Sequence, residues 1–126
     1  NVSADVQLCD SVKTAVTTAV MDPASQADSA SVTKINGWTS TWTSVKTLTG
    51  STDVEVAIQT TLGYTTPGDI ANIDTELKSW NSGTATVEFN VVGSNAVHVR
   101  IAGSDATGLK GQGAGFSATA DIIYVD

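Results

Sequence analysis

The sequence predicts an α+β domain in which an N-terminal amphipathic helix packs on a C-terminal antiparallel sheet of about three strands. Apolar residues recur at steps of three and four from Val2 to Met21, short helical patterns follow, and after Gly83 the apolar period changes to two. We expect one domain over residues 1–126. Its predicted parts are a helix over 3–21, a connecting region with short helices over 24–83, and strands over 85–92, 96–102 and 117–125.

The first helix carries its large apolar residues on one face, which we predict to be its packing and assembly face. These residues are Val2, Val6, Cys9, Val12, Val16 and Val20. Asp5 also falls on the apolar side of the wheel. A carboxylate is favoured near a helix N-terminus, so we expect this end of the helix to be solvated. Pro23 ends the helix, because proline disfavours helical geometry in the residue before it.

The segment 24–50 is rich in Ser and Thr, which are poor helix formers. It also contains apolar residues at helical spacing, and Gly37 interrupts them. We expect a loop, with room for one short helix, whose tryptophans bury their indole rings against the core. The apolar residues are Ile35, Trp38, Trp42, Val45 and Leu48.

Two more helices are predicted in the connecting region. The stretch 52–55 has capping-box spacing from Thr52 to Glu55, and Gly63 supplies a C-cap. The alternation of Val54, Val56 and Ile58 in between also suits a strand, an alternative that stays open. The next helix is expected to begin at 66–69, with Pro67 at its first position, and to end near Trp80. Its apolar stripe is Ile70, Ile73, Leu77 and Trp80.

The C-terminal third reads as a meander of strands. Apolar and polar residues alternate in 85–92 and in 96–102, and the short segment 93–95 between them has the length and composition of a hairpin turn. A last apolar stretch ends the chain at 117–125. The apolar face of such a sheet needs a partner, and the first helix has a stripe of suitable length.

Composition excludes several function classes. The chain has 126 residues with 6 Lys and Arg against 13 Asp and Glu, a net charge of −7, so nucleic-acid binding is not expected. No apolar run approaches the roughly 20 residues that span a bilayer. Cys9 is the single cysteine, which rules out a disulfide or a thiolate-rich zinc site within this chain, and we expect it to be a small buried hydrophobic residue. The heavy use of Ser and Thr is typical of extracellular surfaces.

No catalytic, cofactor or metal site is predicted, and we expect the chain not to be an enzyme. His98 is the single histidine and should be an ordinary surface residue, because it faces away from the apolar side of its strand. The sequence lacks a Gly-x-Ser-x-Gly nucleophile motif. Asp69, Asp74 and Glu76 are expected on the solvated side of their helix.

The glycine-rich segment 103–115 is the candidate surface loop. Backbone N–H groups of such a loop can contact an anion, but a strand follows it, whereas phosphate-binding motifs need a helix there. Calcium binding by Asp105 is not predicted, because the spacing matches no EF-hand. The candidate loop residues are Gly103, Asp105, Gly108, Lys110, Gly111 and Gly113.

The whole pattern resembles the globular head of a type IV pilin or pseudopilin, of the kind seen in Gram-positive anaerobes. The resemblance is carried by the helix SADVQLCDSVKTAVTTAVMDP at 3–23, by EVAIQTTLG at 55–63, and by the order of helix, connecting region and antiparallel sheet. Many Gram-negative pilins have a disulfide-bounded C-terminal loop, and with Cys9 alone this chain departs from that pattern. The role of that loop is therefore not carried over.

The resemblance implies a structural role on the cell surface, without a catalytic site. The first helix would be the C-terminal half of a long spine helix, whose N-terminal half lies in the membrane before assembly and in the filament core afterwards. The partners would be copies of the same chain and other pilins of the same system. Because the sequence starts at Asn1 without an initiator methionine, we expect it to be a fragment of a longer chain, and the resemblance implies that the missing part is an apolar segment.

A second interpretation is an extracellular binding module, either a carbohydrate-binding domain or a phage decoration protein. It would use Trp38, Trp42 or Trp80 as stacking platforms. The exposure of the indole rings distinguishes the two interpretations, because a pilin head should shield them and a binding module should present them.

Overall fold

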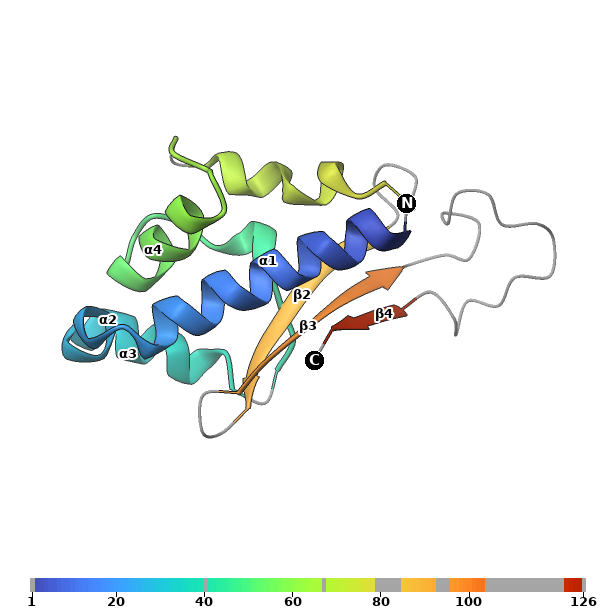
Figure 1. Cartoon of the computed structure of the whole chain (residues 1–126). Helices are drawn as coiled ribbons and strands as arrows, with labels where there is room; N and C mark the ends of the chain where they lie inside the picture. The colour runs from blue at the N-terminus through green and yellow to red at the C-terminus, as the bar shows by residue number, and fades with distance from the viewer. Residues whose placement is uncertain are drawn as a thin grey trace, which may run out of the picture.

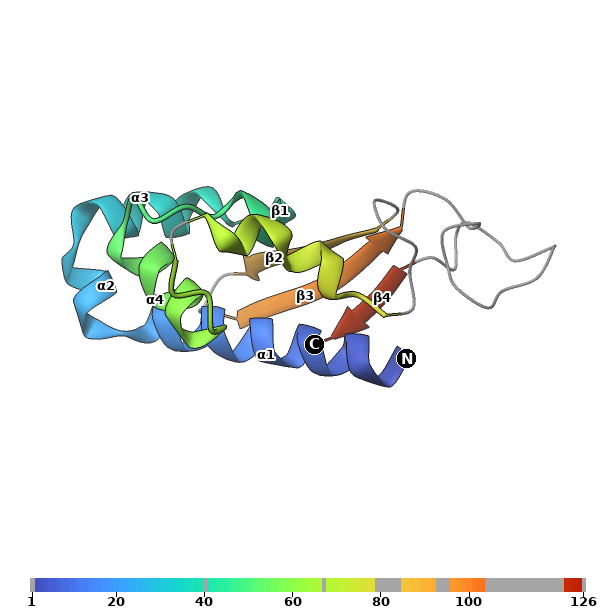
Figure 2. The ribbon, with the colours of Figure 1, turned by 90° about the horizontal axis from the view of Figure 1, so that it is seen from above.

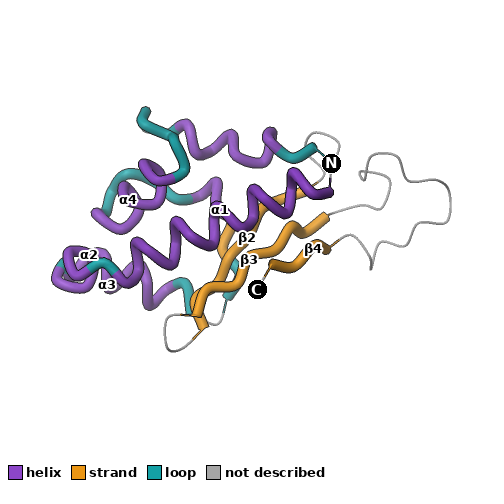
Figure 3. The backbone as a smooth tube through the Cα atoms, viewed as in Figure 1, coloured by secondary structure: helices purple, strands orange, loops and turns teal. Residues whose placement is uncertain are grey.

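The computed structural model describes residues 2–39, 41–66, 68–78, 85–92, 96–103 and 122–125, and it has the predicted α+β architecture (Figure 1). Most helices lie in the first two thirds of the chain, together with one two-residue strand, and the longer strands follow in the last third (Figure 3). The elements are α1 (Val2–Met21), α2 (Pro23–Ala27), α3 (Ser29–Gly37), β1 (Thr43–Ser44), the 3₁₀ helix η1 (Val45–Thr47), α4 (Asp53–Thr61), the 3₁₀ helix η2 (Asp69–Glu76), β2 (Ala85–Val92), β3 (Ala96–Gly103) and β4 (Ile122–Val125).

The first helix ends where Pro23 predicts, but the chain does not then become a loop. The Asp22 side chain accepts a hydrogen bond from the backbone N–H of Ala24 at 2.9 Å, and Pro23 opens α2. Proline suits a first helical turn because its missing N–H would have no partner there. The predicted loop over 24–50 is therefore wrong in its first half, which forms α2 and α3.

Capping explains why α3 forms in a segment of poor helix formers. Asp28 accepts hydrogen bonds from the Ser31 N–H at 3.2 Å and from the Ser31 hydroxyl at 2.7 Å. The same hydroxyl oxygen accepts the backbone N–H of Val54 at 3.1 Å, which connects α3 to α4. Gly37 is the last residue of α3 and does not interrupt it.

The capped helix at Thr52 is confirmed, and the strand alternative is excluded. Thr52 is the N-cap of α4, and its hydroxyl oxygen accepts the Glu55 N–H at 3.3 Å. Gly63 follows with a φ of 89°, a left-handed conformation that glycine adopts without strain.

The next predicted helix exists, but its type and its bounds were wrong. It is the 3₁₀ helix η2, its N-cap is Gly68 with a φ of 92°, and it ends at Glu76. The helix therefore starts after the predicted proline position. Pro67 and Trp80 lie outside the described residues.

The sheet has the order β1-β2-β3-β4, and each neighbouring pair is antiparallel. The register sets Val87 opposite Ile101 and Phe89 opposite Val99, so one face is apolar as predicted. The long strands confirm the predicted sheet, and β1 adds a two-residue edge strand that was not predicted. The hairpin turn 93–95 and the first part of the predicted strand, 117–121, lie outside the described residues.

The core forms where α1 lies on the apolar face of the sheet, mainly against β3 (Figures 1 and 2). Helix α4 also packs against α1. Trp38 closes the core at the C-terminal end of α3, and its ring contacts Phe89 edge-on, with centroids 5.1 Å apart. Val45 and Leu48 are buried as predicted, whereas Ile35 and Trp42 are only half-buried.

Candidate functional site

The predicted packing face of α1 is filled by the chain's own core. Cys9, Val12, Val16 and Val20 are at most 1% exposed, and Val6 is half-buried against them. The side chain of Val2 lies outside the described residues. Because these side chains pack on β3 and α4, they are not available to a second copy of the chain.

The opposite face of α1 is hydrophilic and open to solvent. Its exposed side chains are Gln7, Asp10, Ser11, Thr14 and Thr18. Asp10, Ser11 and Thr14, together with Thr61 at the end of α4, line a groove of about 310 Å³. A partner that meets α1 from outside would therefore contact hydroxyl groups and one carboxylate.

Asp5 is buried, which corrects the prediction of a solvated helix end. It is 1% exposed, and its Oδ1 accepts the backbone N–H of Lys78 at 2.7 Å. The segment that follows η2 runs beside the first turn of α1, as the green-yellow ribbon near the N-terminus shows (Figure 1). In the sequence, the position of Asp5 on the apolar side of α1 was the one indication of this contact. The hydrogen bond fixes the start of α1 to the segment after η2.

Replacing Asp5 with alanine should lower the free energy of unfolding by about 2 kcal/mol, because it removes a buried carboxylate that accepts the backbone N–H of Lys78. Urea denaturation measures the change. Asp10→Ala is the matched control: it removes an exposed carboxylate from the same helix and should change stability by less than about 0.5 kcal/mol. Equal losses in the two variants would contradict a specific role for the Asp5 contact.

Cys9 is buried and chemically inert, as predicted. Burial, followed by the neighbouring carboxylates of Asp5 and Asp10, raises the pKa of the thiol to about 12. A nucleophilic cysteine needs a lowered pKa and access to solvent. Cys9 therefore acts as a small apolar side chain of the core.

The three carboxylates of η2 do not share one environment. Asp69 and Glu76 are exposed as predicted, but Asp74 is not on a solvated face. Its Oδ1 accepts the backbone N–H of Val87 at 3.0 Å, and its Oδ2 lies 3.5 Å from Lys46 Nζ. Val87 belongs to β2, so Asp74 accepts a backbone hydrogen bond from a strand of the sheet. Without this acceptor the N–H of Val87 could pair with the strand of another chain.

The outer face of the sheet, opposite α1, carries a group of polar and aromatic side chains that contact one another. Arg100 Nε donates to Glu88 Oε1 at 2.7 Å across β3 and β2, and its guanidinium carbon lies 4.1 Å from the centre of the Trp42 ring. His98 and Asn90 are opposite each other in the next register position. We call these five residues the Trp42–Arg100 patch.

The sequence predicted the strands of this patch but not its assembly. His98 faces away from the apolar side as expected, and it is half-buried. The pairing of Arg100 with both Glu88 and Trp42 was missed, because the three residues come from three strands or strand ends. The Oδ1 atom of Asn90 is buried, and no described residue donates a hydrogen bond to it.

The two described tryptophans differ in their exposure and in the face of the sheet on which they lie. Trp38 is 4% exposed and belongs to the core, so it is not a stacking platform. Trp42 is half-buried and belongs to the outer sheet face. Trp80 lies outside the described residues, and so do all candidate loop residues except Gly103, which ends β3.

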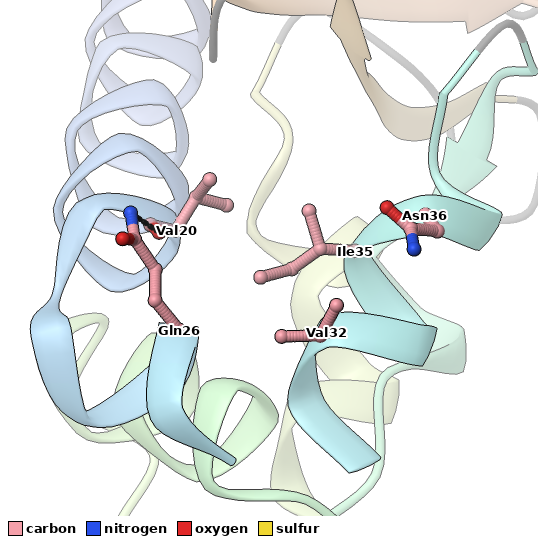
Figure 4. A pocket seen from close by; sticks show the side chains of 5 residues that line it. All are labelled: Val20, Gln26, Val32, Ile35 and Asn36. Atoms are coloured by element: carbon pink, nitrogen blue, oxygen red, sulfur yellow. Dashed lines mark hydrogen bonds between the residues drawn. The ribbon is translucent and has the colours of Figure 1, made fainter. Parts of the chain in front are cut away.

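A separate pocket of about 290 Å³ lies where the end of α1 meets α2 and α3 (Figure 4). Val32 and Ile35 point from α3 toward Val20, and Gln26 and Asn36 add amide groups at the rim. Gln26 Nε2 donates to the backbone oxygen of Val20 at 3.3 Å, so it also caps the end of α1. The volume suits one apolar side chain or a small molecule, not a large cofactor.

Within the described ranges, His, Cys, Asp and Glu side chains nowhere gather in a group of three or more that could hold a metal ion. None of the helices described is both long and apolar enough to cross a membrane. Comparisons of the chain with models of protein families, with curated protein sequences and with solved structures find no match.

Proposed function

We propose that this chain is the globular head of a type IV pilin or pseudopilin, a structural subunit of a cell-surface filament. One observation carries the proposal: α1 packs on an antiparallel sheet, mainly on β3, and continues past the sheet to pack on α4, while its N-terminal end lies at the margin of the fold (Figures 1 and 2). In this proposal the upstream segment continues α1 along the same axis and leaves the head from that margin.

The burial pattern of α1 also supports the proposal. Its apolar stripe holds the head together, so assembly must use other surfaces, and the upstream segment is the one that the resemblance assigns to the membrane and to the filament core. The heads would form the outer surface of the filament. Neighbouring subunits, copies of this chain or other pilins of the same system, would then meet the hydrophilic face of α1.

The first test is the full reading frame of the protein. The proposal requires about 20 apolar residues directly before Asn1, preceded by a leader that is removed. A frame that begins at or just before Asn1, without such a segment, would overturn the proposal. With the segment present, the full-length chain should form filaments in its secretion system, visible by electron microscopy.

A pair of matched variants of the full-length chain tests the surface that the filament uses. Thr14→Arg adds a long cation on the exposed face of α1, and Thr33→Arg adds the same group on the exposed face of α3. We expect Thr14→Arg to reduce filament yield at least tenfold, a cost of about 1.4 kcal/mol per contact, and Thr33→Arg to assemble normally. Normal assembly of both variants would contradict packing of subunits along α1.

A further inference from the structure

We propose that the Trp42–Arg100 patch is a binding site for a neutral oligosaccharide. The proposal does not depend on the filament, because the patch belongs to the head alone. Among the three tryptophans that the sequence offered as stacking platforms, the proposal selects Trp42. The argument rests on where the patch lies, how its groups are fixed and what charge they carry.

The fold places the patch on the face of the sheet that α1 does not cover. Val87 and Phe89 of β2 are fully buried on the core side of the sheet, whereas Glu88 and Asn90 alternate with them and are half-buried. Trp42 directly precedes β1, in which Thr43 pairs with Phe89, so it stands at the register position of Asn90. Strands β2 and β3 and the residue before β1 thus bring one aromatic ring and four polar side chains onto one face of the sheet.

The patch is fixed before any ligand arrives. The bond of 2.7 Å between Arg100 and Glu88 joins two charged groups whose side chains are 21% and 18% exposed. The guanidinium lies against the Trp42 ring at a distance typical of a cation–π contact. Such contacts restrain the guanidinium and the carboxylate, which lowers the entropy that a ligand must remove.

The charge of the patch favours a neutral ligand. Glu88 compensates Arg100 at contact distance, and the chain as a whole carries a net charge of −7. An anionic ligand would gain little from a compensated arginine, and nucleic acid would be repelled. A neutral sugar needs no net charge at its site.

The chemistry of the groups matches that of a sugar ring. An indole has two apolar faces; the Arg100 guanidinium lies over one face of Trp42, so a sugar would place its C–H groups against the other face of this half-buried residue. The guanidinium carries several further N–H donors, and the carboxylate of Glu88 adds acceptors for hydroxyl groups. A sugar presents the complementary combination, with an apolar face of C–H groups and hydroxyls around its edge.

The test is a titration of the ¹⁵N-labelled chain with three neutral probes, cellotetraose, chitotetraose and mannotetraose, and with sialyllactose as an acidic probe. The indole N–H signal of Trp42 is identified by its loss in Trp42→Phe. We expect at least one neutral probe, at up to about 10 mM, to shift this signal. Absence of any shift with all three neutral probes, or a shift with sialyllactose alone, would overturn the proposal.

Matched variants distinguish binding at the patch from binding elsewhere. Arg100→Ala should weaken the affinity for the active probe at least tenfold, whereas Lys34→Ala, which removes an exposed cation from α3, should leave it unchanged. Circular dichroism and thermal unfolding confirm that both variants fold. If Arg100→Ala binds as tightly as the parent chain, the sugar does not use the patch.

Discussion

Replacing Phe89 with alanine is expected to lower the free energy of unfolding by about 4 kcal/mol, the largest effect of any single substitution that we predict. Phe89 is fully buried at the centre of β2, and the edge of one ring meets the face of the other where it contacts Trp38, with an interplanar angle of 76°. Removing the ring leaves a cavity in the core beside β2 and also removes the ring contact of Trp38. The measurement is urea denaturation followed by tryptophan fluorescence.

Two companion variants keep this prediction falsifiable if Phe89→Ala does not fold. Phe89→Leu retains most of the volume and should cost about 1.5 kcal/mol. Val92→Ala shortens an exposed apolar side chain of the same strand and should cost less than about 0.5 kcal/mol. A loss in Phe89→Leu no larger than that in Val92→Ala would show that Phe89 is not a centre of the core.

The second large effect is expected at Glu55, a buried carboxylate at the start of α4. It has no exposed surface, and the chain from Thr49 to Thr52 wraps around it. One oxygen accepts the Thr49 N–H at 2.6 Å and the Thr49 hydroxyl at 3.2 Å; the other accepts the hydroxyls of Ser51 and Thr52 at 3.0 and 2.8 Å. Glu55→Ala should cost about 3 kcal/mol, because it leaves this set of donors without an acceptor.

The stabilisation by Glu55 should depend on pH in a defined direction. Burial raises the pKa of the carboxyl, but the hydrogen bonds from Thr49, Thr52 and Ser51 and the charge of Lys34 outweigh burial and hold this pKa below its ordinary value. The unfolded chain therefore binds a proton more readily than the folded chain. The contribution is complete above the ordinary pKa of glutamate and is lost as the pH falls through the lowered pKa of the folded state.

The experiment compares the parent chain with Glu55→Gln by denaturation at a series of pH values. The difference in stability should be largest at neutral pH and should narrow as the pH falls to about 3. Asp53→Asn is the matched control, since Asp53 is an exposed carboxylate in the same helical turn. A difference for Glu55→Gln that does not change with pH would contradict this account.

The elements that were predicted correctly are those whose signals are local. The stripe of α1 needs only its own spacing, and the α4 boundary needs only Thr52, Glu55 and Gly63. The alternation in β2 and β3 likewise lies within each strand. The α3 helix was missed because its stability comes from Asp28 and from a contact with α4, which the low helix propensity of Ser and Thr conceals.

The candidate site was less predictable than the fold, because its residues are joined across the sheet. Nothing near Arg100 in the sequence points to Trp42, which lies almost sixty residues before it, and the three-strand register alone brings them together. Asp74 was likewise not predictable: it was assigned to a solvated face, but its carboxylate accepts a hydrogen bond from the N–H of Val87 in a distant strand.

By itself, the sequence determined the α+β class, the long first helix with its apolar stripe, the α4 cap and the central antiparallel hairpin strands. These depend on periodicity and on capping residues within a few positions of each other. Only the tertiary structure decided that Asp5 and Glu55 are buried with partners, and that Trp42, unlike Trp38, leaves the core and meets Arg100 on the other face of the sheet. The exposure of a side chain and the groups that it contacts depend on which distant segments pack together. No local stretch of the sequence determines that packing.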